Sequence, residues 1–257
     1  MKQITSTNNQ IIKQLKSLHQ KKYRKQYDSF LIEGTRLIFD AIKNSIKIDT
    51  VLIHQDKLDK FSQIINSLNE DCAIYVVSDA IINSLCLTDS PEGIIAKVHI
   101  PSINTEDFNN KLVLVLDGVQ DPGNLGTIIR TANSAGIRDI YLLGSNVDVY
   151  NPKVVRSAMG SIFFINFHQF NDADELYTHL KDHGYSICVT TLSNRSYYDI
   201  SLPNKVALVM GNEGNGVSEK SISKADLLLT LPMDEKAESL NVAVCTGILI
   251  YDILHRR

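Results

Sequence analysis

Three loops in the second half of the chain carry the residues best suited to bind a ligand or take part in a reaction. The first spans residues 116–137, LDGVQDPGNLGTIIRTANSAGI, where an apolar strand ends at Asp117 and a helix follows. Gly123 and Gly126 would let the start of this helix approach a phosphate, which Arg130 could clamp. Taken alone, the loop favours a plainer account, in which a tight turn leads to a helix with a surface arginine.

The second loop, VMGNEGNGVS at residues 209–218, directly follows an apolar segment of strand length. Its three glycines would let main-chain amides point at a ligand, and Glu213 offers acceptors to a ribose or an amine. The G-x-x-G-x-G spacing differs from the dinucleotide-binding fingerprint and no long helix follows, so a dehydrogenase is not predicted. A glycine-rich hairpin without a ligand remains an alternative.

The third loop, PMDEKAESLNVAV at residues 232–244, joins an apolar strand at Leu227–Leu231 to a helix at Asn241–Leu254 that is apolar all round. Ser239 lies where a helix N-cap is expected, so its hydroxyl could bond an early amide or a ligand. Three small residues in the helix would let another backbone approach it, namely Ala243, Cys245 and Gly247. A polar loop held at both ends by core elements is a rigid place for a site.

Strands and helices alternate through residues 111–257, and this pattern determines where the three loops lie. Six apolar segments have strand length, with helical patterns between most of them: Leu112–Leu116, Ile140–Leu143, Ile162–Phe167, Ser186–Thr190, Val206–Met210 and Leu227–Leu231. The alternation predicts an α/β domain with a parallel sheet and helices on both faces. Sites in such sheets gather at the carboxyl ends of the strands, where all three loops begin.

Residues 1–100 form a second, smaller α/β pattern, whose polar residues show no catalytic spacing and therefore favour a binding role. Its expected strands are Phe30–Glu33, Thr50–His54, Ala73–Val77 and Gly93–Ile100. Residues 101–110, PSINTEDFNN, are rich in turn formers and poor in apolar residues. We therefore predict two domains, 1–100 and 111–257, joined by a linker at 101–110.

The first 30 residues carry a positive charge that the whole chain, with a formal net charge of −3, does not. Seven basic side chains in this stretch face one acid, Asp28: Lys2, Lys13, Lys16, Lys21, Lys22, Arg24 and Lys25. A solvated helix face would explain them, because the apolar residues between Ile11 and Leu18 form a stripe opposite the lysines. Contact with nucleic-acid phosphates would explain them equally well, with Tyr23 and Tyr27 as stacking groups.

Composition bounds the class of protein. With 257 residues and 44% hydrophobic content, the chain can bury a sizeable core. No apolar run reaches membrane-spanning length and the first residues lack the features of a signal peptide, so we expect a cytoplasmic protein. The four cysteines are scattered, which favours reduced, structural thiols. His179 and His183 stand one helical turn apart, but without an evident third ligand they favour a solvated helix end over a metal site.

In this order and at this distance from the C-terminus, the three loops resemble the three motifs of the SpoU (TrmH) branch of the SPOUT methyltransferases. These enzymes methylate the ribose 2′-hydroxyl of RNA with S-adenosylmethionine as cofactor. The resemblance covers roughly residues 111–257, and FLIEG at Phe30–Gly34 is similar to part of the small substrate-binding domain that precedes the catalytic domain in many members. It implies a SPOUT domain with a trefoil knot, a homodimer, no metal and no membrane association.

The resemblance also implies roles for individual residues. The family's catalytic positions match Asn124, Arg130, Glu213 and Asn241. The cofactor would be held by Thr191, Leu192, Met210, Gly211, Asn212, Gly216, Leu231, Met233, Ser239 and Leu240. RNA would be bound by Arg130 and by the basic residues Lys21, Lys22, Arg24 and Lys25.

The function that the resemblance implies is an RNA ribose 2′-O-methyltransferase that depends on S-adenosylmethionine. Large-subunit (23S) ribosomal RNA is the first expected substrate, because an N-terminal binding domain is present. Transfer RNA is one alternative, and a non-catalytic RNA-binding or ribosome-assembly factor is another. Proposals for the family make the arginine a general base, but an arginine normally stays protonated. We therefore expect Arg130 to hold an RNA phosphate and to stabilise the developing alkoxide.

Overall fold

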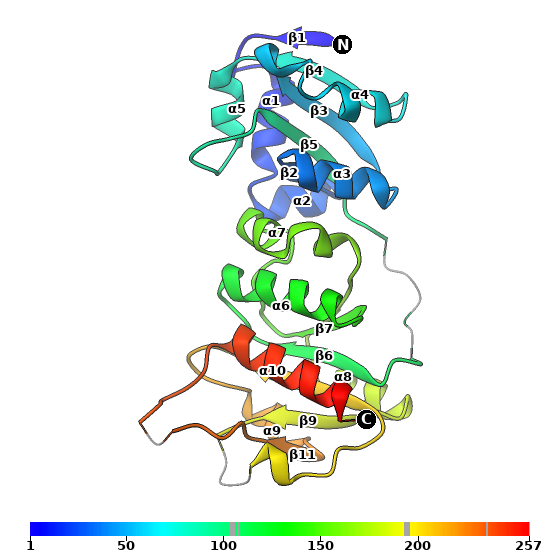
Figure 1. The fold of residues 1–257 in the computed structure, drawn as a ribbon, viewed down its shortest axis with the longest axis vertical. Helices are drawn as coiled ribbons and strands as arrows, with labels where there is room; N and C mark the ends of the chain where they lie inside the picture. The colour runs from blue at the N-terminus through cyan, green and yellow to red at the C-terminus, as the bar shows by residue number, and fades with distance from the viewer. Residues whose placement is uncertain (103–105, 107, 193–195, 235, 257) are drawn as a thin grey trace. The chain divides into compact units, whose positions relative to one another are not determined.

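The computed structural model describes residues 1–102, 106, 108–192, 196–234 and 236–256. The chain forms two compact units (Figure 1): unit 1 comprises residues 1–102 with 150–163, and unit 2 comprises residues 103–149 with 164–257. Each unit has its own sheet and hydrophobic core. Part of the predicted linker, at 103–105 and 107, lies outside the described residues.

Unit 1 is built on a mixed five-stranded sheet. Its strands are β1 (Lys2–Ile4), β2 (Ser29–Glu33), β3 (Ile48–His54), β4 (Ala73–Val77) and β5 (Ile94–His99). They lie in the order β1-β4-β3-β5-β2, with β4 parallel to both of its neighbours and β5 antiparallel to both of its own. The helical elements are α1 (Gln10–Ser17), α2 (Lys21–Tyr27), α3 (Thr35–Lys43), η1 (Gln55–Lys57), α4 (Ser62–Ser67), α5 (Asp79–Leu85), α7 (Pro152–Ala158) and η2 (Met159–Phe163).

The basic N-terminal stretch forms two helices rather than one. α1 starts after Asn9, whose side chain accepts a hydrogen bond from the Ile11 amide, and it buries Ile12 and Leu15. α2 ends at Asp28, which adopts a left-handed conformation with a φ of 46°. The apolar stripe predicted from the sequence therefore packs α1 into the core of unit 1.

Unit 2 contains six strands: β6 (Leu112–Asp117), β7 (Asp139–Leu143), β8 (Asn166–Phe170), β9 (Ser186–Thr190), β10 (Val206–Gly211) and β11 (Leu227–Leu229). They pair in the order β11-β9-β10-β6-β7-β8, and all these pairings are parallel. Every residue of β6 and β10 is buried, as expected for central strands covered on both faces. The predicted α/β fold with a parallel sheet is confirmed.

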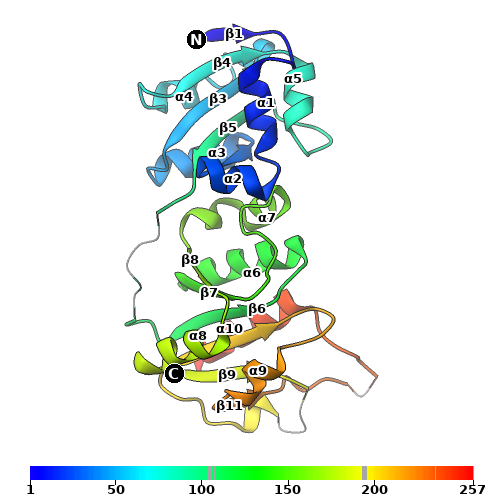
Figure 2. The same cartoon turned by 180° about the vertical axis from the view of Figure 1, so that it is seen from behind.

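Helices cover both faces of this sheet: α6 (Pro122–Ser134), α8 (Ala173–Asp182), η3 (Tyr197–Asp199), α9 (Glu219–Ser223) and α10 (Val242–His255). α6 and α10 pack together on one face (Figure 1), and α8 lies on the other (Figure 2). Val113, Val115 and Val209 point to the α8 face, where they share a core with Leu176 and Tyr177. None of the helices in the described part of the chain is both long and apolar enough to cross a lipid bilayer.

Two elements differ from the sequence-based predictions. The strand expected at Ile162–Phe167 begins only at Asn166, because Met159–Phe163 forms a 3-10 turn that starts at a positive φ. The short strand β1 is not predicted, since its three residues are too few to show an alternating pattern.

Candidate functional site

The loops that follow β6 and β10 meet because these strands are neighbours. Their register pairs Asp117 with Gly211, so both strands end at the same edge of the sheet. A cavity of about 750 Å³ opens there, a size typical of small-molecule sites. Its walls come from Asn124, from residues 190–192 and 210–217, and from the segment between Leu229 and Leu249.

All the residues predicted to hold the cofactor line this cavity, although they lie far apart in the sequence. They are Thr191, Leu192, Met210, Gly211, Asn212, Gly216, Leu231, Met233, Ser239 and Leu240. Three of the residues predicted as catalytic, Asn124, Glu213 and Asn241, line it as well. The structure thus brings these residues together, while their individual roles stay a prediction.

The glycine-rich loop is a tight turn closed on itself. Asn212 and Gly216 exchange two backbone hydrogen bonds of 2.8 and 3.0 Å, and the Asn212 side chain accepts from the amides of Gly214 and Asn215. A Cβ atom at Gly211 would lie 2.4 Å from the carbonyl carbon of Gly216, which itself has a φ of 70°. The backbone therefore requires glycine at both positions. The hairpin alternative describes the local shape correctly, and the same turn forms a cavity wall.

Glu213 fastens this turn to the loop before α6. Its carboxylate accepts three hydrogen bonds of 3.1 Å, from the backbone amides of Gln120 and Asp121 and from Asn124 Nδ2. Partial burial by itself would raise the pKa of Glu213, but the hydrogen bonds outweigh it and lower that pKa. The carboxylate is therefore ionised at neutral pH.

These bonds occupy several donors near the start of α6, where the sequence suggested a phosphate site. The amides of residues 120 and 121 already donate to Glu213. The helix is capped by Asp121, whose side chain accepts from the Asn124 amide over 2.8 Å. A carboxylate of the protein itself thus lies beside the loop that leads into α6, and a phosphate held by the helix start and Arg130 stays a prediction.

Two further contacts hold the glycine-rich turn at its ends. Asn212 Nδ2 donates to the carbonyl oxygen of Gly118 over 2.8 Å. At the other end, the buried carboxylate of Asp117 accepts from the amide and the hydroxyl of Ser218 and from the hydroxyl of Ser221. The turn is therefore positioned by β6 and by the loop after it.

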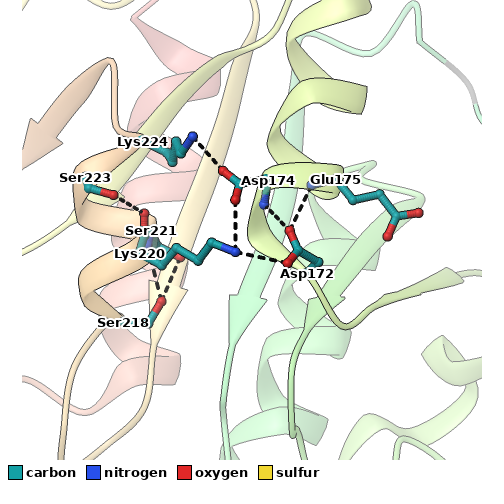
Figure 3. Close-up of polar contacts among 8 residues, drawn as sticks. All are labelled: Asp172, Asp174, Glu175, Ser218, Lys220, Ser221, Ser223 and Lys224. Carbon is teal, nitrogen blue, oxygen red and sulfur yellow. Dashed lines mark hydrogen bonds and ion pairs between the residues drawn. The ribbon is translucent and has the colours of Figure 1, made fainter.

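The short helix α9 that follows the turn is tied to the start of α8 (Figure 3). Lys220 Nζ lies 3.0 Å from the carboxylates of both Asp172 and Asp174, and Lys224 pairs with Asp174. These side chains are exposed, and ion pairs of this kind contribute little individually. The buried bonds to Asp117 are the firmer anchor.

Asn241 is the N-cap of α10. Its Oδ1 accepts from the amides of Ala243 and Val244 over 2.9 and 3.2 Å. The sequence suggests Ser239 for this cap, but the helix begins later and Ser239 is an exposed residue of the cavity wall. Asn241 Nδ2 donates to Asn124 Oδ1 over 2.8 Å, and this bond joins the third loop to the first.

A buried hydroxyl marks the wall after β9. The backbone of Thr191 is paired, since its amide donates to the Leu229 carbonyl and its own carbonyl accepts from Thr230 Oγ1, each over 2.9 Å. Its Oγ1 is buried and has no hydrogen-bond partner within the described part of the chain. An unpaired buried hydroxyl costs about 1–3 kcal/mol, so this atom is suited to a ligand that enters the cavity.

Sequence reasoning missed several apolar residues of the wall. They are Val217, Ile222, Cys245 and Leu249. Burial raises the pKa of Cys245 to about 11, so this thiol is a neutral wall residue and not a nucleophile. Cys245 follows Asn241 by one helical turn, and this spacing could have predicted that both face the cavity.

Arg130 stands apart from this group. It is exposed on α6 and is not among the described residues that line the cavity. It follows Asn124 by six residues, which places it about 9 Å further along the helix and on a different side. A single chain thus brings together Asn124, Glu213 and Asn241 but does not add Arg130 to them.

Among the basic residues predicted to bind RNA, Arg24 has a different task. Its side chain is 3% exposed, and Nη1 donates to the carbonyl oxygens of Leu18 and His19 over 2.7 and 2.8 Å. Arg24 therefore stabilises the turn between α1 and α2, which corrects the prediction for this residue. The others are exposed and remain predicted RNA contacts: Lys21, Lys22 and Lys25.

His179 and His183 contact residues of the predicted linker, 101–110. His179 Nε2 lies 3.1 Å from the carboxylate of Glu106, and Phe108 stacks on His183 with ring centroids 3.6 Å apart. His183 Nδ1 donates to the carbonyl oxygen of His179 over 2.8 Å. Within the described residues, no group of three or more His, Cys, Asp or Glu side chains is arranged to hold a metal ion.

Comparison with known proteins agrees with this geometry. Residues 111–251 match the model of the SpoU rRNA Methylase family, and residues 9–96 match the MRM3-like substrate binding domain. Over 254 residues the chain is 37% identical to the 23S rRNA (guanosine(2553)-2'-O)-methyltransferase RlmP of Bacillus subtilis, and the match covers 98% of this chain and 99% of the relative.

Solved structures extend the similarity to the whole chain. An AdoMet-bound rRNA methyltransferase from Sinorhizobium meliloti has a TM-score of 0.86 and 29% identity, covering 99% of this chain and 98% of its own. An RNA 2'-O ribose methyltransferase has a TM-score of 0.84 and 32% identity, covering 99% of both chains. The resemblance inferred from the three loops is confirmed, and the chain belongs to the SpoU rRNA methylase family.

Proposed function

We propose that this protein transfers a methyl group from S-adenosylmethionine to a ribose 2′-hydroxyl of 23S ribosomal RNA. One observation carries the proposal: three loops distant in sequence converge on one cavity, whose lining includes every residue predicted to hold the cofactor. RlmP of Bacillus subtilis supports the substrate class, because its name gives a guanosine 2′-hydroxyl of 23S rRNA as its target.

The chemistry of the cavity suits this cofactor. Leu231 and Leu240 offer apolar surface to an adenine, and the main chain of the glycine-rich turn offers hydrogen bonds. The Thr191 hydroxyl supplies a polar partner inside the wall. Glu213 and Glu238 line the cavity with negative charge, which favours a sulfonium cation.

The residues of the chain must orient the RNA and assist the loss of the proton from the ribose 2′-hydroxyl. When bound, S-adenosylmethionine supplies a methyl group that is already activated. The protein has to hold the ribose hydroxyl at the cavity and stabilise its oxygen as the proton leaves. We assign Arg130 to an RNA phosphate and to this developing alkoxide, since its guanidinium stays protonated.

We infer that the chain acts as a homodimer that packs through α10. Val244, Ile248 and Tyr251 recur at i, i+4 and i+7 and are 53%, 41% and 43% exposed. A contiguous apolar stripe of this kind favours a protein partner. α6, which carries Arg130, packs against α10. A second copy on this face would therefore lie near the guanidinium of Arg130. Arg130 of one subunit could then complete the site of the other subunit.

The N-terminal unit is assigned to RNA binding. Lys21, Lys22 and Lys25 are exposed on α2 and can neutralise phosphates. Tyr23 lies between these lysines and Tyr27 follows them, and the two rings stack with centroids 6.3 Å apart. With this assignment, unit 1 binds RNA and unit 2 transfers the methyl group.

Two further expectations follow from the family. The segment from β11 to α10 would thread through a loop to form a trefoil knot around the cofactor. The small residues Ala243 and Gly247 support this arrangement, because they would ease the close passage of the threaded segment. The protein would act in the cytoplasm, where ribosomes are assembled.

Two measurements test the proposal. Calorimetry should detect binding of S-adenosylmethionine, and ribose-methylation mapping of total RNA with and without the gene should reveal one 23S rRNA position that loses its modification. Loss of a transfer RNA modification instead would support the alternative substrate. Absence of cofactor binding would support a non-catalytic assembly factor and overturn the enzyme assignment.

A further inference from the structure

Two side-chain amides connect a carboxylate to a helix N-terminus inside the cavity wall. Glu213 Oε1 accepts from Asn124 Nδ2 over 3.1 Å. Asn124 Oδ1 in turn accepts from Asn241 Nδ2 over 2.8 Å. Asn241 Oδ1 accepts from the first amides of α10. We call this chain of hydrogen bonds, formed by Glu213, Asn124, Asn241 and the α10 N-terminus, the amide relay.

The two ends of the amide relay determine the orientation of both asparagines. An ionised carboxylate can only accept hydrogen bonds, so it requires the NH₂ group of Asn124 on its side. The backbone amides of α10 can only donate, so they require the oxygen of Asn241 on theirs. Each side-chain amide therefore has one orientation that satisfies its neighbours. Turning either asparagine amide over would place an NH₂ group against another donor.

Glu213 has no free role in proton transfer under this arrangement. Its two oxygens accept from Gln120, Asp121 and Asn124, three donors that belong to the loop before α6 and to the first turn of that helix. To remove a proton from a ribose, the carboxylate would have to leave these donors. The same hydrogen bonds lower the pKa of Glu213, which makes it a weaker base. The observed contacts suit a residue that sets positions.

We propose that Glu213 is a positioning residue, whose negative charge fixes the polarity of the amide relay and thereby holds the start of α10 in register with the glycine-rich turn. All three side chains line the cavity, so the relay sets the spacing of two walls that a ligand would touch. This inference rests on the proposed function, because it assigns the purpose of the spacing to binding of S-adenosylmethionine.

Two substitutions test the relay, because together they move the negative charge from residue 213 to its neighbour in the relay, residue 124. Glu213→Gln places an NH₂ group against donors whichever way the amide turns. Asn124→Asp places a carboxylate against the carboxylate of Glu213. Each single variant should bind S-adenosylmethionine at least about tenfold more weakly, a loss of about 1.4 kcal/mol that lies within the usual range for coupled contacts.

The double variant Glu213→Gln with Asn124→Asp should restore most of the affinity. The introduced glutamine amide would donate to the introduced carboxylate, whose second oxygen would still accept from Asn241 Nδ2, so the α10 cap keeps its polarity. One bond, from the Asp121 amide, would be lost. We expect the double variant to bind the cofactor within about threefold of the wild type and to melt at a higher temperature than either single variant.

Methyl transfer distinguishes positioning from proton transfer. If Glu213 positions the loops, the double variant recovers kcat together with cofactor affinity and keeps the pH profile of the wild type. Recovery of affinity without kcat, or an altered pH profile, would mean that one of the two exchanged side chains takes part in the reaction itself, and would overturn the inference that the relay only sets positions. Additive losses in the double variant would also overturn it.

Two controls separate this test from the proposed function. Glu219→Gln removes an equal charge from exposed α9 and should bind the cofactor as the wild type does. Failure of the wild-type protein itself to bind S-adenosylmethionine would contradict the proposed function. In that case the melting temperatures still test the relay, since the double variant must remain more stable than the single ones.

Discussion

Ser218 donates both its amide and its hydroxyl to a single oxygen of Asp117, over 3.0 and 2.7 Å, although 101 residues separate the two. Asp117 is 9% exposed and ends β6, whereas Ser218 follows the glycine-rich turn. The hydroxyl of Ser221 donates to the same oxygen over 2.7 Å. One buried carboxylate thus fixes the point where the turn rejoins the fold.

Asp117→Ala should lower the free energy of unfolding by about 3 kcal/mol, because it leaves a buried amide and two hydroxyls without their acceptor. Asp117→Asn should cost less than about 1.5 kcal/mol, since its carbonyl oxygen can accept the same bonds without the charge. Urea unfolding measures both variants. Equal stability of Asp117→Ala and the wild type would show that the turn has another anchor.

Gly211→Ala should disrupt the cavity proposed to hold the cofactor. Its Cβ atom would lie 2.4 Å from backbone atoms of the turn, which cannot move aside as a flexible side chain could. We expect a loss of about 1–3 kcal/mol in stability and at least a tenfold loss in affinity for S-adenosylmethionine, measured by calorimetry. Gly247→Ala is the matched control: its Cβ would lie 3.6 Å from Thr131 Cγ2, an ordinary contact. Similar losses in both variants would point to a general effect of alanine.

Arg130→Ala should abolish methyl transfer and leave cofactor affinity nearly unchanged, because Arg130 lies outside the cavity lining of its own chain. Loss of one group that stabilises a developing oxyanion lowers kcat by about 100-fold or more. Arg138→Ala, which removes another exposed arginine of the same unit, should retain activity. Loss of cofactor binding together with activity would contradict the role assigned to Arg130.

Arg24→Ala and Lys25→Ala should affect different properties, stability and RNA binding, although the residues are adjacent. The first removes a buried guanidinium that donates to two carbonyl oxygens, and should destabilise the protein by about 2–3 kcal/mol. The second should leave stability intact and weaken RNA binding. It should also reduce the slope of log affinity against log salt by about 0.7–0.9. An unchanged slope would remove Lys25 from the RNA-binding surface.

The sequence was sufficient for the central strands of unit 2 and for the positions of the loops that follow them. Central strands of a parallel sheet are apolar throughout, so Leu112–Leu116 and Val206–Met210 were recognisable as runs, and the structure extends each by one residue. The cavity residues followed from the family motifs that come after these strands. Because parallel strands end at one edge, loops far apart in the sequence could be expected to meet.

The partners of individual polar residues could not be obtained in this way. Asp117 and Glu213 owe their roles to donors that are distant in sequence, and a strand pattern does not specify which loop lies opposite. Arg24 groups with the exposed lysines only if one continuous helix is assumed. The break between α1 and α2 resets the helical phase and turns this side chain inward.

The bond between Asn124 and Asn241 also bears on how the protein is made. A ribosome that has just added residue 124 must add a further 117 residues before the partner exists. Until then the first loop lacks the wall to which it is bonded. The cavity is therefore complete only when nearly the whole chain has been made.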